Sequence, residues 1–283
     1  MNLPTPRDLL RLLRISNLPT VWTNAFLGWW LAGGGPWLSY LGAALALSAL
    51  YGAGMVLNDA RDADWDAAHN PGRPIPSGRV SRRFAWGAGG LLLGLGIGIA
   101  FVTSPIAGLY AVGLAAAILL YGEIHKSQPG WGALTMGVCR SLAIVTGAAA
   151  SPSNGSPAAW VAALAVGTYV IAVTRLARDE HLSAPPRPPF WTWPLLFAPW
   201  VVAALWMPAT AWTDRWALLP ALAWTAFALR NLALHRGRLI GDLLSGLCLL
   251  DLALVAPVPP PIAGAMLAAF ALCLLLRRRV PAS

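Results

Sequence analysis

Long apolar segments of similar length dominate this sequence and limit what it can fold into. A helix that crosses a lipid bilayer needs about 20 mostly apolar residues, with a usable range of roughly 17–25. Proline-containing connections separate the segments, which is where helices are expected to end. We expect ten candidate spans, at residues 18–35, 38–57, 84–103, 105–121, 131–150, 157–174, 190–208, 214–230, 240–256 and 260–276.

These segments predict an all-α fold, a polytopic membrane helical bundle of nine to ten transmembrane helices formed by residues 1–283 as a single membrane domain. Polar loops at 58–83 and 175–189 hold acidic residues and separate helix pairs, which suits a bundle of two halves around a central cavity. The chain is 57% hydrophobic and only 11% charged, too apolar for an ordinary soluble domain.

The basic residues predict the orientation in the membrane. If ten spans alternate in direction, all of the 20 Lys and Arg residues except Arg140 and Arg215 fall on one side. Positive residues favour the cytoplasmic face. We therefore expect a bacterial inner membrane protein with both termini and the acidic loop in the cytoplasm. The net charge is +9, but the sequence contains no soluble module that could bind nucleic acid, which argues against a nucleic-acid partner.

A cluster of acidic residues follows the second apolar segment directly. Four of the eleven acidic residues fall within nine positions. On a helix, positions four apart drift by about 40°, so Asn58, Asp62 and Asp66 should line one face, with Asp59 beside them and Asp64 pointing away. Closely held carboxylates repel one another unless a cation lies between them, and oxygen ligands suit Mg²⁺. A solvated acidic loop at the membrane surface is the plainer alternative.

Residues 58–66 have the pattern N-D-x-x-D-x-x-x-D, and residues 73–78 are R-P-I-P-S-G. Together they resemble the first aspartate-rich motif of the UbiA superfamily of intramembrane prenyltransferases. The resemblance implies a UbiA-like bundle, Mg²⁺ as cofactor, and a prenyl diphosphate and a lipophilic acceptor as substrates. Asp62 and Asp66 would be catalytic, and the metal ligands would include Asn58, Asp59, Asp62 and Asp66. Arg73 would add a bidentate phosphate contact, unless it only anchors the topology.

A weaker resemblance lies at residues 121–126, Y-G-E-I-H-K, which is similar to the tyrosine and basic residue that follow the fourth span in the family. It implies that Tyr121 contacts substrate and that Lys126 binds phosphate and assists catalysis as a point charge. Tyr121 suits an ordinary interfacial aromatic equally well.

The second aspartate-rich motif of the family, D-x-x-x-D, is altered here. Residues 174–181 are T-R-L-A-R-D-E-H, so that Arg175 occupies the place of the earlier aspartate and Asp179 that of the later one. Asp179 remains a candidate metal ligand. Either Arg175 and Arg178 bind the diphosphate directly in place of a second metal ion, or catalysis is lost.

Arg140 lies about halfway along the fifth apolar segment, where an isolated charge is costly. We expect it to bind substrate or to pair with a carboxylate of the acidic loop. Pairing with Asp242 or Asp251 of the ninth segment is an equal alternative.

The sequence therefore favours a magnesium-dependent transfer of a prenyl group from a polyprenyl diphosphate to an aromatic or other lipophilic acceptor. The MGVCRSL run at 136–142, the altered second motif and the RRRVPAS ending are similar to the EboC-like branch of the family. Arg175 favours an alternative, a non-catalytic polyprenyl-binding, lipid-binding or transport-assisting membrane protein. A metal-dependent transporter is weaker, because its paired carboxylates would lie near mid-membrane.

Overall fold

The structure, a computed structural model, describes residues 4–178, 187–206, 215–230 and 236–280, and these ranges are helical throughout apart from turns and short loops. A helix lies on each of the ten predicted segments. These are α2 (Leu18–Leu31), α3 (Trp37–Arg61), α5 (Arg82–Thr103), α6 (Pro105–Ile124), α7 (Pro129–Ala149), α8 (Pro157–Ala177), α9 (Thr192–Leu205), α10 (Leu218–Arg230), α11 (Arg236–Val255) and α12 (Pro260–Arg279). Two short helices, α1 (Pro6–Leu12) and α4 (Ala63–His69), lie outside them.

Six of these helices, α3, α5, α6, α7, α8 and α12, are long and apolar enough to cross a membrane. Helices α2 and α9 each have 14 residues and α10 has 13. Fourteen residues rise by about 21 Å, less than the roughly 30 Å of a hydrocarbon core. The described residues therefore form a multi-pass membrane protein, and the count of nine to ten spans stays a prediction.

Prolines and serines determine where several helices begin. Helices α6, α7, α8 and α12 start at a proline, whose missing N–H would have no helical partner at that position. The hydroxyl oxygens of Ser104 and Ser156 accept hydrogen bonds from backbone N–H groups in the first turns of α6 and α8. Helix α2 ends at Leu31, before the predicted residue 35, because three consecutive glycines that follow have φ between 66° and 137°.

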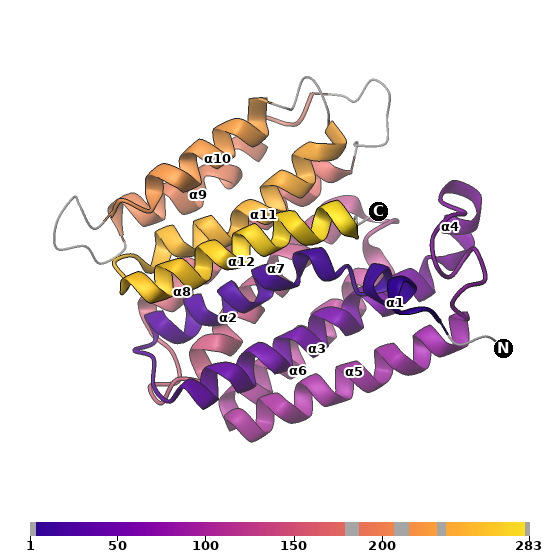
Figure 1. The fold of residues 1–283 in the computed structure, drawn as a ribbon, viewed down its shortest axis with the longest axis horizontal. Helices are drawn as coiled ribbons and strands as arrows, with labels where there is room; N and C mark the ends of the chain where they lie inside the picture. The colour runs from indigo at the N-terminus through magenta and orange to yellow at the C-terminus, as the bar shows by residue number, and fades with distance from the viewer. Residues whose placement is uncertain (1–3, 179–186, 207–214, 231–235, 281–283) are drawn as a thin grey trace.

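Close backbone packing joins α2 to α7 in the middle of the bundle. A Cβ atom on Gly28 would lie 1.9 Å from the carbonyl oxygen of Ile144, and one on Gly147 would lie 2.4 Å from that of Ala25. Small residues allow such approaches between membrane helices. Figure 1 shows α2 and α7 near the centre, with α9 and α10 on one side and α3 and α5 on the other.

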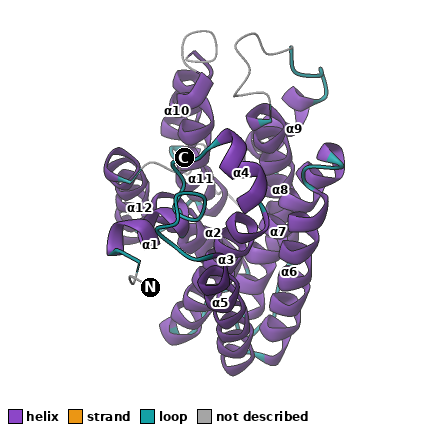
Figure 2. Ribbon diagram, turned by 90° about the vertical axis from the view of Figure 1, so that its right-hand side faces the viewer, coloured by secondary structure: helices purple, strands orange, loops and turns teal. Residues whose placement is uncertain are grey.

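The short helices and the polar loops mark one end of the bundle. Helices α1 and α4 and the last turn of α12 lie together at this end (Figure 1), and Figure 2 shows the bundle from it. The acidic cluster predicted to be functional is part of this end, because residues 58–66 span the end of α3 and the first half of α4.

Candidate functional site

The acidic cluster forms where the chain leaves α3 and enters α4. Asp62 lies between the two helices with ψ of −1°, which departs from helical backbone. The Asp62 N–H still donates to the Asn58 carbonyl oxygen, and the Asp66 N–H donates to that of Asp62, both at 2.9 Å. Asp59, Asp62 and Asp66 are buried, whereas Asp64 points outward, as the sequence predicted, and it pairs with Arg82.

Asp62 lies in a first group of contacts with Asn58 and the end of α6. The Asn58 amide donates to Asp62 Oδ2 at 3.2 Å, and Lys126 Nζ lies 2.7 Å from Asp62 Oδ1. His125 Nε2 lies 3.2 Å from Asp62 Oδ2. Burial alone would raise the pKa of Asp62, but the hydrogen bonds from His125 and Lys126 and the positive charge of Lys126 outweigh it and hold that pKa below its usual value.

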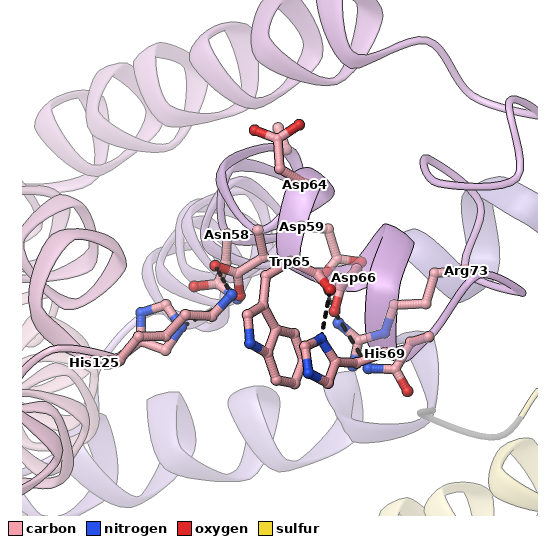
Figure 3. Close-up of polar contacts among 12 residues, drawn as sticks. Asn58, Asp59, Asp64, Trp65, Asp66, His69, Arg73 and His125 are labelled. Atoms are coloured by element: carbon pink, nitrogen blue, oxygen red, sulfur yellow. Dashed lines mark hydrogen bonds and ion pairs between the residues drawn. The ribbon is translucent and has the colours of Figure 1, made fainter.

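Asp59 and Asp66 form a second group around Arg73. Arg73 Nη1 lies 2.7 Å from Asp66 Oδ2 and 3.9 Å from Asp59 Oδ1, and Arg14 Nη2 lies 3.1 Å from the same Asp59 oxygen. Figure 3 shows Asp59, Asp66 and Arg73 together, with His125 on the other side of the cluster. The residues predicted to share one face thus have different partners, Asp62 contacting Asn58 and Lys126 and Asp66 contacting Arg73.

Arg14 is a part of this cluster that the sequence analysis missed. It has a left-handed backbone conformation, with φ of 43° and ψ of 50°, between α1 and the 3-10 turn Ile15–Asn17. The Tyr51 hydroxyl donates to its carbonyl oxygen at 3.1 Å. The sequence shows Arg14 only as one of three arginines before the first apolar segment, and nothing there indicates that it would reach Asp59.

A cavity lies beside the cluster, among α2, α3, α6 and α7. It extends along one face of α3 from Leu47 to Asn58, a rise of about 16 Å. Tyr121 lines it and stacks on His125, with ring centroids 4.9 Å apart, so this tyrosine faces the site. The remaining lining is mostly apolar and includes Val21, Leu50, Gly54, Met55, Leu114, Ile118, Met136, Cys139 and Ala143.

The oxygen donors of the cluster fit a magnesium ion that also binds a ligand. Among the described residues, no three His, Cys, Asp or Glu side chains converge as a complete metal site. Magnesium, however, usually takes one or two carboxylates together with substrate phosphates and waters. Asn58 Oδ1 is buried without a hydrogen-bond partner, and the Asn58 amide contacts Asp62. Such an orphaned oxygen next to a carboxylate suits a hard cation.

The predicted second motif is described only in part. Arg175 lies in the last turn of α8 and is half-buried, and Arg178, the residue after this helix, is exposed. Asp179 lies outside the described residues. The roles of Arg175, Arg178 and Asp179 therefore stay predictions.

Arg140 lines the cavity at a distance from the acidic cluster along α7. Its Nη1 donates to Asn24 Oδ1 at 2.6 Å and lies 3.4 Å from Thr20 Oγ1. Of the two predicted carboxylate partners, Asp242 pairs with Arg277 instead. Asp251 is linked to Arg140 through Asn24, whose amide donates to both Asp251 oxygens at 2.9 and 2.7 Å.

Comparison with known proteins agrees with the fold and the motif. Residues 18–280 match the UbiA prenyltransferase family. The chain belongs to this family. A digeranylgeranylglyceryl phosphate synthase of Natronomonas pharaonis is 30% identical over 179 residues, which cover 61% of this chain and 62% of that protein. The chain thus aligns with less than two thirds of the length of this relative and of other synthases of the same name.

Two solved UbiA structures have the same fold as this chain. One, from a study of digeranylgeranylglyceryl phosphate synthase in membranes, superposes with a TM-score of 0.56 at 18% identity and covers 96% of this chain and 94% of its own. The other, a UbiA homologue from Archaeoglobus fulgidus bound to DMAPP and Mg²⁺, has a TM-score of 0.50 at 16% identity and covers 95% and 98%. At these identities the likeness shows the fold.

Proposed function

We propose that this UbiA protein transfers a prenyl group from a polyprenyl diphosphate to a lipophilic acceptor in a magnesium-dependent reaction. The observation that carries this proposal is the arrangement of buried carboxylates and cations next to an apolar cavity. Asp59, Asp62 and Asp66 contact Arg14, Arg73 and Lys126, and Asn58 belongs both to this cluster and to the cavity wall.

Some residues of the chain would bind the metal ion, and others would bind the diphosphate. Asn58 and Asp62 would hold the magnesium ion, with Asp59, Asp66 and Asp179 as further proposed ligands. Bound magnesium would neutralise charge that builds on the leaving diphosphate. Lys126 and Arg73 would contact phosphate oxygens, the former as a point charge and the latter through its planar guanidinium. Arg175 and Arg178 are proposed to add positive charge from the end of α8.

The cavity would take the prenyl chain and bring its reacting carbon to the acceptor. Its mostly apolar lining along α3, α6 and α7 suits an isoprenoid, and Tyr121 lies at the end nearest Asp62. The Archaeoglobus fulgidus homologue of this fold binds DMAPP and Mg²⁺, which supports both ligands. The name of the Natronomonas pharaonis relative suggests a prenylated glycerol phosphate as the first acceptor to test, beside aromatic ones.

The finer assignments from the sequence stay part of this proposal. Membership of the EboC-like branch rests on the MGVCRSL run, the altered second motif and the C-terminal basic residues. Location in the bacterial inner membrane, with the acidic cluster in the cytoplasm, rests on the distribution of basic residues.

Release of diphosphate from labelled prenyl diphosphates by the purified protein tests the proposal. We expect release that requires magnesium and that falls at least about 100-fold in Asp62→Ala, the typical effect of losing a group that stabilises the transition state. Asp64→Ala is the matched control, because Asp64 belongs to the same motif but points outward to Arg82. Each assay includes a prenylglyceryl phosphate and a phenolic acceptor. Binding without turnover in all assays would contradict the proposal and favour a lipid-binding protein.

A further inference from the structure

Arg140 differs from the other cations of the site in its ion-pair and hydrogen-bond partners. Arg14, Arg73 and Lys126 each lie within 3.1 Å of a carboxylate oxygen of the acidic cluster. Arg140 has no carboxylate within ion-pair distance among the described residues, and its hydrogen-bond acceptors are the neutral Asn24 amide and Thr20 hydroxyl. Its positive charge is therefore not cancelled by direct contact.

A chain of hydrogen-bonded, buried polar side chains holds the Arg140 guanidinium in position. Asp251 is fully buried, and its oxygens accept hydrogen bonds from Thr23 Oγ1 at 2.6 Å and from the Asn24 amide. With its N–H groups facing Asp251, Asn24 must present its carbonyl oxygen to Arg140, which donates to it. The network joins α2, α7 and α11, so three helices from distant parts of the sequence set the direction of one guanidinium.

Arg140 is part of the cavity wall, and its hydrogen bonds to other described residues use one of its three nitrogens. Within the described part of the chain only Nη1 makes hydrogen bonds, while the side chain is half-buried and forms part of the cavity wall. A guanidinium carries five N–H donors in a planar fork that matches an oxyanion. Donors at membrane depth without partners are costly, so a ligand oxygen would satisfy them.

The position of Arg140 separates it from the diphosphate site. It lies eleven residues after Pro129, the first residue of α7, a rise of about 16 Å. The cavity also reaches this depth along α3. Tyr51, which lines the same cavity as Arg140, lies seven residues, or about 10 Å, before Asn58. A group bound at Arg140 is thus deeper in the bundle than a diphosphate bound by the acidic cluster.

We propose that Arg140 binds an oxyanion, a carboxylate or a phosphate carried by the acceptor, and that Asn24 and Asp251 act as positioning residues for it. This inference rests on the proposed function, since it assigns the second substrate of the same cavity. It predicts that acceptors with an oxyanion are preferred over neutral acceptors of the same shape.

Equilibrium binding to the full-length protein in phosphatidylcholine nanodiscs tests the inference, with binding to empty nanodiscs subtracted. In each of two ligand pairs the alkyl chain is the same and only one member carries an oxyanion, namely hexadecylglycerol phosphate against hexadecylglycerol, and palmitate against methyl palmitate. We expect the charged member of at least one pair to bind about tenfold tighter or more, as for a hydrogen bond to a charged group. Preference in the first pair identifies a phosphate, and preference in the second a carboxylate. Equal binding within both pairs would overturn the inference.

Variants separate recognition by Arg140 from a merely structural role. Arg140→Gln should remove the preference for the charged ligand, and the double variant Arg140→Gln/Asp251→Asn should do so without leaving Asp251 as a lone buried charge. Asp251→Asn alone should keep the preference, because an asparagine oxygen still accepts from Thr23 and Asn24, whereas Asp251→Ala should lower it. The control Lys126→Met removes a cation of the acidic cluster and should leave the preference unchanged.

A preference that survives in Arg140→Gln, or that disappears in Lys126→Met, would refute the assignment. The measurement uses neither prenyl diphosphate nor turnover. Its result is therefore independent of whether magnesium-dependent release of diphosphate is observed.

Discussion

At the scale of single residues, the buried carboxylates of the acidic cluster depend on partners that are distant in sequence. Asp59 is 45 residues from Arg14, and Asp62 is 63 residues from His125. Removing one member of a buried pair leaves the other as an uncompensated charge, which is strongly destabilising. Substitutions in the cluster therefore need a control for folding beside the assay of activity.

Asp8 provides a pH-dependent contact outside this cluster. Thr5 Oγ1 donates to one Asp8 oxygen at 2.6 Å, and Arg79 Nε donates to the other at 2.8 Å, which ties α1 to the loop after α4. The hydrogen bond from Thr5 and then that from Arg79 lower the pKa of Asp8 from its usual 3.8. A carboxylate with a lowered pKa stabilises the fold above the unfolded-state pKa, and this contribution disappears as pH falls through the folded-state value.

We therefore expect Asp8→Asn to be less stable than the wild type at pH 7, because asparagine keeps the shape but loses the charge. The difference should shrink as pH falls below about 3.8. Thermal unfolding in detergent from pH 7 to pH 3 measures it. Asp64→Asn, at an exposed carboxylate, is the comparison, and a constant difference for Asp8→Asn at all pH values would contradict the expectation.

At the scale of helices, the contact between α2 and α7 depends on the absence of side chains. Gly28→Ala would place a methyl group against the Ile144 carbonyl oxygen and the Ala148 nitrogen, both backbone atoms. We expect a loss of roughly 1–3 kcal/mol in stability, as for other overpacked sites. The control is Gly98→Ala in α5, where an added Cβ meets nothing within 4 Å and the greater helix propensity of alanine is favourable.

Thermal unfolding of both variants in the same detergent checks this expectation. Equal melting temperatures for Gly28→Ala and the wild type would show that α2 and α7 separate more readily than their backbone contact indicates.

Sequence patterns were sufficient to locate the helices on the ten apolar segments but not all of their ends. Apolar length and proline position are local properties, and they locate segments such as α6 and α8 well. The end of α2 and the break at Asp62 depend on backbone conformations that the apolar pattern does not record. The helix is interrupted at Asp62, and the contact of Asp66 with Arg73 is likewise absent from the apolar pattern.

At the scale of the whole molecule, both ends of the described chain lie at the end of the bundle that carries the acidic cluster. If this end is cytoplasmic, Ser127, in the α6–α7 connection, and Ser153, in the α7–α8 connection, should lie on opposite sides of the membrane. Both residues are exposed.

Cysteine labelling tests this orientation in a background without Cys139, Cys248 and Cys273. A membrane-impermeant maleimide should label Ser153→Cys in intact bacterial spheroplasts and Ser127→Cys only after permeabilisation. The reverse pattern would place the acidic cluster outside the cytoplasm.

The sequence also located most of the candidate site but not its assembly. Asn58, Asp62, Tyr121 and Lys126 come together as expected, since a motif records which residues matter. It does not record that Arg14 joins them from the N-terminal segment or that Asn24 holds Arg140. Those contacts result from how α2, α3 and α7 pack, which is a property of the complete bundle.

The pairing of carboxylates with cations in the acidic cluster has a consequence for how the two proposed ligands, magnesium and diphosphate, would affect each other's affinity. Without ligands, Asp59, Asp62 and Asp66 are neutralised by Arg14, Arg73 and Lys126. A magnesium ion that takes a carboxylate releases a cation from its partner, and a diphosphate that takes a cation releases a carboxylate. Each ligand therefore supplies the counter-charge that the other displaces. If both ligands bind as proposed, thermodynamic linkage requires each to raise the affinity for the other equally, and the protein would favour the metal–diphosphate complex over either ion alone.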